Sequence, residues 1–267
     1  MGLQVLVSAV KKEAKELARQ MNLESNAIII IQDDGFAFQE FEIDSGINSD
    51  DGSIVKKKVK AYTFAERGVG LSRNNALMRA EDELLLFSDE DIVFDHGYAQ
   101  IITREFAAHP AADLIMFNVK VDKRRATYEN KAFHRVRWYN YGRYPAYSIA
   151  ARTDKIHAAN VNFSLLFGGG AKYASGEDTL FLHDCLKKGL RLFASPQFIG
   201  CEVYRESTWF DGFTEKFFHD RGVMYRYLYG VMANPLAFRF LWSKRKEMCR
   251  DIKLRQAYHL MKEGIRK

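Results

Sequence analysis

The chain has 267 residues, enough for one large domain or for one domain with an appended segment. Hydrophobic residues make up 47% of it and only four positions are proline, which excludes a disordered or fibrous chain. Three widely spaced cysteines, no basic leader and no run of about 18 apolar residues predict a cytoplasmic protein with reduced thiols and no membrane-spanning helix.

Positive charge is concentrated at the C-terminal end. Residues 239–267 hold ten Lys and Arg against three Asp and Glu, a net charge of +7, whereas the whole chain carries +6. Residues 1–238 therefore sum to −1 (6 − 7), so binding of nucleic acid would depend on the tail alone. That function also leaves the acidic motifs of the body unexplained, and we expect no nucleic-acid partner.

The first half of the chain alternates apolar runs with amphipathic segments. The pattern predicts strands at 3–10, 27–31, 58–64, 83–87 and 113–121, and helices at 11–21, 71–81 and 97–109. Short apolar strands separated by helices are typical of an α/β fold, with a mostly parallel sheet covered by helices on both faces.

Polar and aromatic stretches interrupt or follow this pattern. Residues 33–53 are acidic and rich in turn formers, which predicts a hairpin or an exposed excursion. Residues 123–145 are basic and aromatic, and their polarity predicts a position outside the core. Residues 209–267 are expected to form an aromatic and basic helical extension, attached to an α/β domain of residues 1–208.

Three acids, Asp89, Glu90 and Asp91, directly follow the apolar run LLLF of the fourth predicted strand. If the chain stays extended past this run, Asp89 and Asp91 point to the same side. Two carboxylates at the carboxyl end of a parallel strand suit Mg²⁺ or Mn²⁺, which prefer oxygen ligands. The alternative is a solvent-exposed turn that happens to be acidic.

A second acidic pair, Glu177 and Asp178, opens a predicted helix shortly after the glycines Gly168–Gly170. Ser175 could cap this helix with Asp178 at its third position, in which case the pair has a structural role only. A carboxylate at a helix N-terminus is also held in its ionised form, as a general base requires. The sequence leaves both interpretations open.

Arg67 and Arg73 flank a glycine-containing turn at the start of the predicted helix 71–81. Backbone N–H groups at a helix N-terminus and nearby arginines can bind phosphate. The glycines lack the full spacing of a dinucleotide-binding loop, so the motif alone is weak.

Taken in order, five motifs resemble those of the family 2 glycosyltransferases, inverting enzymes of the GT-A fold that use nucleotide-diphosphate sugars. They are VSAV (7–10), IIQDDG (30–35), GLSRNNAL (70–77), FSDED (87–91) and GEDTLF (176–181), which together cover roughly residues 3–200. The segment GGGAKYASGEDTLFLHDCLKKG is also similar to enzymes that assemble bacterial surface polysaccharides.

The resemblance implies a role for each matched position. The implied donor-binding residues are Ser8, Asp33 or Asp34 near the nucleoside, Arg67 and Arg73 near the diphosphate, Gly169 and Asp89. Asp91, with Asp89, would bind Mn²⁺ or Mg²⁺, and His219 is a further candidate ligand, although a lone histidine is more often structural. Asp178 would be the general base and Glu177 a supporting acid.

The implied reaction moves a sugar, from a UDP-sugar if the acidic turn reads uracil, to a hydroxyl of a growing lipid-linked or glycoprotein glycan. Gln32 leaves the position that would read the base uncertain by one residue. The Q-x-x-R-W motif of processive synthases is absent, and the nearest segment with a tryptophan is ESTWF (206–210). A sugar nucleotidyltransferase is the alternative enzyme, but SAVKKEAKE lacks the glycine-rich loop expected after its first strand.

The tail has two further interpretations. Its aromatic and basic side chains could contact an anionic bilayer peripherally, at the inner face of the membrane and near a lipid-linked acceptor. They could instead cover the sheet or form a homo-oligomer interface. The residues concerned are Tyr225, Tyr227, Tyr229, Phe238, Phe240, Trp242, Lys244, Arg245 and Lys246.

Overall fold

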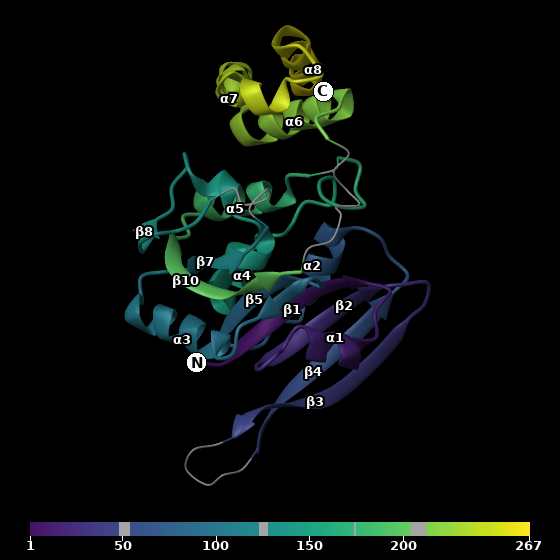
Figure 1. Ribbon diagram of the computed structural model, residues 1–267, viewed down its shortest axis with the longest axis vertical. Coiled ribbons are helices and arrows are strands. Elements are labelled where there is room, and N and C mark those ends of the chain that lie inside the picture. The colour runs from purple at the N-terminus through teal and green to yellow at the C-terminus, as the bar shows by residue number, and fades with distance from the viewer. Residues whose placement is uncertain (48–53, 123–127, 174, 204–211) are drawn as a thin grey trace.

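The computed structural model describes residues 1–267 except 48–53, 123–127, 174 and 204–211 (Figure 1). Within the described residues, ten strands form one sheet in the order β3-β4-β2-β1-β5-β9-β7-β10-β6, and β8 pairs with β10. The strands are β1 (Leu3–Val10), β2 (Asn26–Gln32), β3 (Ala37–Ile47), β4 (Ile54–Phe64), β5 (Leu84–Asp89), β6 (Ile92–Phe94), β7 (Leu114–Lys120), β8 (His134–Arg135), β9 (Ile149–Arg152) and β10 (Leu192–Glu202).

The described strands mostly run in one direction. β4, β2, β1 and β5 are parallel neighbours, and β7 is parallel to β10. β9 lies between β5 and β7 and is antiparallel to both, so β5 and β7 are parallel. The strands that share one direction are β4, β2, β1, β5, β7 and β10. All five strands predicted from the sequence are present, which confirms the mostly parallel sheet.

Helices cover both faces of the sheet. They are α1 (Ala14–Gln20), α2 (Val69–Met78), α3 (Tyr98–Ala108), α4 (Thr153–Ala159) and α5 (Glu177–Lys187), with 3-10 turns η1 (Tyr141–Arg143) and η2 (Ala146–Ser148). Side chains of a strand alternate between faces, so Leu84 and Leu86 join the core under α1 and α3. Leu85 and Phe87 join the opposite core, under α2, α4 and α5.

The C-terminal helices pack together at one end of the molecule (Figure 1). α6 (Glu215–Tyr229), the 3-10 turn η3 (Gly230–Met232), α7 (Ala233–Met248) and α8 (Leu254–Arg266) share a third core, which includes Phe167 and Leu180 of the body. Gly222 and Gly264 let α6 and α8 approach closely, because a Cβ at either would collide with the facing backbone. The expected boundary after residue 208 and the segment 206–210 lie outside the described residues.

The structure agrees with the prediction for one polar stretch and contradicts part of the prediction for the other. β3 and β4 form an antiparallel hairpin at the sheet edge, as predicted for residues 33–53. The prediction that 123–145 lies outside the core is wrong for Val136, Tyr141 and Tyr144, which are buried. Aromatic rings with one polar tip can be buried where their hydroxyl finds a partner, and Tyr144 bonds Asn130.

Two expectations from composition can be compared with the structure. The three cysteines are free thiols, as predicted. Among the described helices, none combines the length and the apolar character needed to cross a bilayer.

Candidate active site

The residues predicted to bind the donor gather where parallel strands end. Ser8 of β1 is the register partner of Asp89 in β5, so the ends of these strands lie side by side. Asp33 and Asp34 follow β2, and Arg67 follows the neighbouring β4. In open α/β sheets, ligands bind beyond the carboxyl ends of the strands, which is where these four segments meet.

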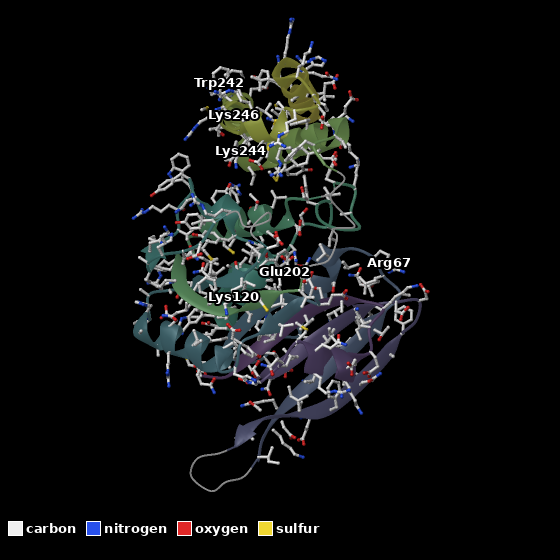
Figure 2. All side chains as sticks on the ribbon, in the orientation of Figure 1. Arg67, Lys120, Glu202, Trp242, Lys244 and Lys246 are labelled. Carbon is white, nitrogen blue, oxygen red and sulfur yellow. The ribbon has the colours of Figure 1, made fainter. Side chains whose placement is uncertain are left out.

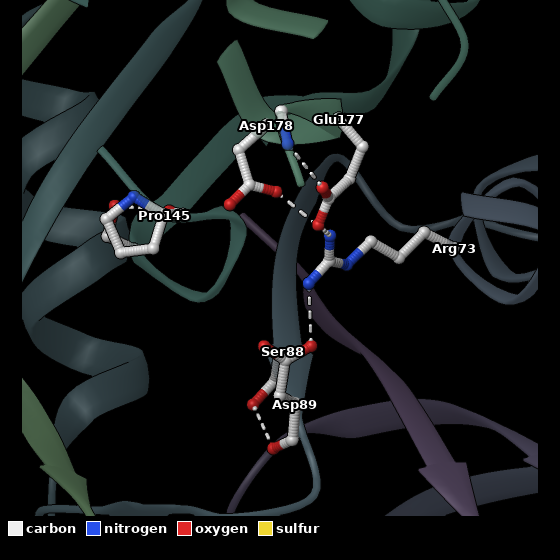
Figure 3. Close-up of polar contacts among 8 residues, drawn as sticks. Arg73, Ser88, Asp89, Pro145, Glu177 and Asp178 are labelled. Atoms are coloured by element: carbon white, nitrogen blue, oxygen red, sulfur yellow. Dashed lines mark hydrogen bonds and ion pairs between the residues drawn. The ribbon is translucent and has the colours of Figure 1, made fainter. Parts of the chain in front are cut away.

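Arg73 of α2 lies at the centre of the acidic residues (Figure 3). Its Nη2 donates to Oδ1 of Asp89 at 2.8 Å, and its Nη1 donates to Oε1 of Glu177 at 3.0 Å and to Oδ1 of Asp178 at 2.9 Å. The Arg73 side chain is only 4% exposed. One buried guanidinium therefore joins the acid that ends β5 to the acid pair that begins α5.

The charges in this cluster shift one another's pKa. Burial alone would lower the pKa of Arg73, but the carboxylates of Asp89, Asp178 and Glu177 raise it above its ordinary value. Burial, and then the charge of Glu177, raise the pKa of Asp178 to about 8, although Arg73 and a backbone hydrogen bond from Ala146 oppose this shift. Asp178 therefore ionises only near pH 8, and the expectation that the helix N-terminus keeps this carboxylate ionised at neutral pH is wrong.

The start of α5 is not capped in the way that the sequence suggested. Its N-cap is Gly176, with φ of 119°, and no side chain caps the helix, so the Ser175 cap, one of the two interpretations that the sequence left open, is wrong. A Cβ at Gly176 would lie 2.5 Å from the Met224 sulfur, which explains why glycine occupies this tight position. With no cap to form, Glu177 and Asp178 both contact Arg73.

The glycine-rich loop packs against the turn that precedes α2. The backbone N–H of Val69 donates to the Gly169 carbonyl at 2.9 Å. A Cβ at Gly170 would lie 3.2 Å from the Gly68 backbone, and one at Gly168 would lie 2.9 Å from the Glu177 carboxyl carbon. The glycines thus allow two loops, about 100 residues apart in sequence, to approach beside the acidic cluster.

Asp91 does not extend the strand that precedes it. β5 ends at Asp89 and a turn follows, so the chain is not extended to Asp91, as pointing Asp89 and Asp91 to the same side would require. The Asp91 carbonyl accepts a hydrogen bond from Val203 at 2.8 Å, which fixes this turn against the chain after β10. Within the described part of the chain, no three His, Cys, Asp or Glu side chains group closely enough to form a ready-made metal site.

His219 lies on α6, where its Nδ1 is 3.2 Å from Oδ1 of the adjacent Asp220. This contact matches the structural role more common for a lone histidine. The role of His219 as a metal ligand stays a prediction.

The acidic turn after β2 lies at the surface. Asp34 is 3.3 Å from Lys11 Nζ and 3.5 Å from Arg67 Nη2, and all three side chains are exposed. Gln32 points elsewhere, because its Oε1 accepts the Gly68 N–H at 2.7 Å. The turn therefore leaves Asp33 and Asp34, not Gln32, as the polar side chains at the mouth of the site.

Some site features carried no signal in the sequence. The backbone of Ala146, in η2, supports the Asp178 carboxylate, and backbone groups leave no sequence pattern. The buried hydroxyls of Ser8 and Ser72 and the Nε of Arg73 have no hydrogen-bond partner among the described residues. Buried polar atoms are normally paired, so the Ser8 hydroxyl, beside Asp89, is available to a ligand.

The sequence matches no protein-family model, and no curated protein matches it. Among solved structures, it is similar to S. aureus TarS 1-349 in complex with UDP-GlcNAc, with a TM-score of 0.63 and 15% identity over 99% of this chain and 82% of that one. The complex of TarS 1-349 with UDP has a TM-score of 0.58 and 14% identity, over 94% of this chain and 74% of that one. The longer S. aureus TarS has a TM-score of 0.58 and 16% identity, over 96% of this chain and 46% of that one. TarS is a GT-A glycosyltransferase, and this chain has the GT-A glycosyltransferase fold.

Proposed function

We propose that this chain is an inverting glycosyltransferase that moves a sugar from a UDP-sugar to a hydroxyl of a growing glycan. The observation that supports it most is the convergence of Asp89, Glu177 and Asp178 on Arg73, at the carboxyl ends of parallel strands. The fold is that of glycosyltransferases, and the similar TarS structures are complexes with UDP-GlcNAc and UDP.

Asp178 is the proposed general base. A carboxylate that must accept a proton from an alcohol works best when its pKa is raised toward the operating pH, and burial raises the pKa of Asp178 to about 8. Arg73 and the backbone of Ala146 hold this carboxylate in place. Glu177 supports it by sharing the same guanidinium nitrogen.

One displacement is enough for this reaction. The acceptor oxygen attacks the anomeric carbon from the face opposite the nucleotide while Asp178 takes its proton, and the bond to the diphosphate breaks. Configuration is inverted and no covalent nucleophile is needed. The proposal therefore does not include the second displacement of a retaining mechanism.

Ser8, Asp33, Asp34, Arg67 and Gly169 are the proposed donor-binding residues. Ser8 offers a buried hydroxyl without a partner, and the Asp33–Asp34 turn offers carboxylates that can accept from a uracil imide. Arg67 is an exposed cation that can approach a diphosphate. Arg73 was expected to do so as well, but its contacts with three carboxylates favour an internal role.

A divalent cation fits the donor atoms that the site provides. When all three are ionised, the carboxylates of Asp89, Glu177 and Asp178 outweigh the one positive charge of Arg73, and hard oxygen donors suit Mg²⁺ or Mn²⁺. Asp91 and Asp89 would hold the ion, since Mg²⁺ commonly uses one or two carboxylates together with water and phosphate. Such an ion neutralises a departing diphosphate.

The acceptor and the place of action are also proposals. We propose a lipid-linked or glycoprotein glycan as acceptor, and a cytoplasmic protein that can contact the inner face of the membrane through α7. Exposed Phe238 and Trp242, with Lys246 one turn after Trp242 on the same helix, support this contact (Figure 2).

Hydrolysis of sugar nucleotides tests the central proposal. Glycosyltransferases without acceptor slowly transfer the sugar to water, so the purified chain with Mn²⁺ is expected to release UDP from one or a few of a panel of sugar nucleotides. Asp178→Asn should abolish this release, and Asp91→Asn should also weaken nucleotide binding. Release that is equal for the wild-type and Asp178→Asn proteins would contradict the proposal.

A further inference from the structure

The basic and aromatic segment 128–145 lies next to the acidic cluster, and the donor site described above does not use it. Its residues Val136, Tyr141 and Tyr144 are buried in the core below α5. The Val136 N–H also donates to the Leu192 carbonyl at 2.8 Å. The segment is therefore attached firmly to the body, and its exposed side chains are presented from a fixed support.

Two contacts place this segment beside the proposed base. Figure 3 shows Pro145, the last residue of the segment, next to Asp178, and the backbone of the following residue, Ala146, lowers the pKa of Asp178. A Cβ on Gly142 would lie 3.4 Å from Cγ2 of Thr179, which follows Asp178 in α5. Trp138 is four residues before Gly142, so their Cα atoms are at most about 14 Å apart.

The tip of the segment exposes two aromatic rings. Trp138 is 68% exposed and Tyr139 is 65% exposed. Their ring centroids are 5.7 Å apart with the planes nearly perpendicular. The Arg137 N–H donates to Asn140 Oδ1 at 2.7 Å, which closes the turn that carries both rings. Large rings held in solvent by a braced turn are typical of a binding surface.

Three arginines of the segment have no acidic partner among the residues that the structure describes. Arg135 lies over the Phe193 ring at 4.9 Å and Arg143 over the Tyr128 ring at 4.2 Å, while Arg137 is exposed. No described carboxylate lies within ion-pair distance of any of them. Residues 128–145 hold four Lys and Arg against one acid, a net charge of +3 (4 − 1), in a body whose overall charge is close to zero.

We propose that Trp138, Tyr139 and Arg137 bind the acceptor, outside its reacting hydroxyl, and that the acceptor is an anionic glycan. This inference rests on the proposed function and deepens it. Exposed aromatic rings suit the flat C–H face of a sugar ring, and unpaired guanidinium groups suit carboxylate or phosphate substituents. A position next to Asp178 is where the acceptor must enter, which favours a glycan over a polynucleotide.

Binding to the full chain tests the inference without a known acceptor. The first probe pair is oligogalacturonate and its methyl ester, in which a methyl group replaces each negative charge, and the second is phosphorylated dextran and dextran. We expect the wild-type protein to bind a charged member at least about tenfold more tightly than its neutral partner, the factor that corresponds to about 1.4 kcal/mol. Carboxylate and phosphate sources are distinguished by which pair shows the difference.

Single substitutions locate the binding surface. Trp138→Ala should weaken binding of the preferred charged glycan about tenfold, and Arg137→Gln should weaken it about threefold and reduce its salt dependence. Trp242→Ala is the matched control, because Trp242 is a similarly exposed tryptophan on α7. Both tryptophans are exposed, so their replacement leaves the core intact, which circular dichroism can verify.

Three results would overturn the inference. They are equal affinity for charged and neutral probes, unchanged affinity in Trp138→Ala, and tighter binding of a single-stranded DNA oligonucleotide than of any glycan. UDP binding by the wild-type protein is measured in parallel. If UDP binds while no charged glycan does, the inference fails and the proposed transferase stands; if UDP does not bind, the proposed function itself fails.

Discussion

Arg73 Nη1 lies 2.9 Å from Asp178 Oδ1, although 105 residues separate them in sequence. The same guanidinium also holds Asp89 and Glu177, so α2, β5 and α5 are joined at one buried cation. When all three acids are ionised, the cluster carries a net charge of −2 (1 − 3). Burial, and then the charge of Glu177, raise the pKa of Asp178, and the excess of negative charge makes the site suitable for a divalent cation.

Asp178→Asn removes the proposed base while keeping the size of the side chain. General-base catalysis typically contributes about 10²–10⁴-fold, so we expect kcat for transfer, or for slow sugar-nucleotide hydrolysis, to fall by that factor. UDP affinity should change little, because the base acts on the acceptor. Steady-state kinetics and calorimetric titration with UDP measure the two effects.

Asp184→Asn is the control for this substitution. Asp184 lies on the same helix and is half-exposed beside His183, so its loss should leave turnover near the wild-type value. Full turnover by Asp178→Asn would instead show that the acid pair is structural.

The raised pKa of Asp178 predicts a pH dependence. A general base acts in its ionised form, so kcat/KM should rise about tenfold per pH unit and level off near pH 8. A profile that is flat between pH 6 and 8 would contradict this prediction. The rate profile of the free enzyme, measured at low substrate concentration, is the relevant observation.

Stability gives an independent check of the same shift. The pKa of Asp178 is raised from 3.8 to about 8 on folding, so its contribution to stability is fully present below about pH 4 and is lost as the pH rises through 8. Asp178→Asn cannot ionise. The Tm of this variant relative to the wild type should therefore increase between pH 5 and 9, whereas a constant difference would exclude the shift.

Arg73→Met leaves three acids without their shared cation. Removing one partner of a buried ion pair typically costs 3–5 kcal/mol, and since the acids are partly exposed we expect about 3 kcal/mol. Arg73→Lys keeps the charge but cannot bridge the acids with two nitrogens, so its loss should be intermediate. Arg67→Ala should cost less than about 1 kcal/mol, because Arg67 is 53% exposed and forms one long ion pair. Urea denaturation measures the free energy of unfolding of all three variants. Equal losses for Arg73→Met and Arg67→Ala would refute the central role of Arg73.

The sheet could be predicted from sequence, because burial on both faces leaves continuous apolar runs. The runs at 3–10, 27–31 and 83–87 correspond to β1, β2 and β5 within about two residues at each end. β9 and β10 were not predicted. β10 contains Pro196 and polar residues that interrupt its apolar pattern, and its pairing with β7 shifts register there.

The site could be predicted by its residues but not by its contacts. The sequence indicates Asp89, Glu177, Asp178 and Arg73 as polar residues at element ends, yet gives Arg73 a ligand-facing role. Whether a guanidinium contacts phosphate or carboxylate depends on which loops meet in space. Gly168 and Gly170 pack against the start of α2 and the turn before it, and this packing brings Arg73 close to Glu177 and Asp178. A contact between two distant loops has no local sequence signal.

Gly222→Ala tests whether α6 and α8 depend on close packing. A Cβ at Gly222 would collide with the backbone of Met261, so the helices must separate, and overpacking of this kind typically costs about 1–3 kcal/mol. Gly35→Ala is the control, since nothing lies near its Cβ position and its φ is not left-handed. Thermal denaturation of both variants gives the comparison, and equal Tm values would show that the helices can part freely.

The face of α7 that points away from the core predicts binding to an anionic bilayer. Phe238 is 45% exposed and Trp242 is 52% exposed, with ring centroids 6.1 Å apart, and Arg245 lies 4.5 Å from the Trp242 ring. Figure 2 labels Lys244 and Lys246 on the same helix. Aromatic rings at headgroup level next to lysines are typical of interfacial helices.

Vesicle co-sedimentation measures this binding. The wild-type protein should sediment with vesicles that contain anionic lipid and not with neutral vesicles, and Lys246→Gln should weaken binding about fivefold. Trp242→Ala should weaken it as well, while Trp138→Ala, on the body, should not. Point substitutions are preferable to truncation near Ala233, because loss of α7 and α8 would uncover the core of α6. If no vesicle binds and Trp242→Ala instead converts a dimer to a monomer in light scattering, α7 is a subunit interface and the membrane proposal is wrong.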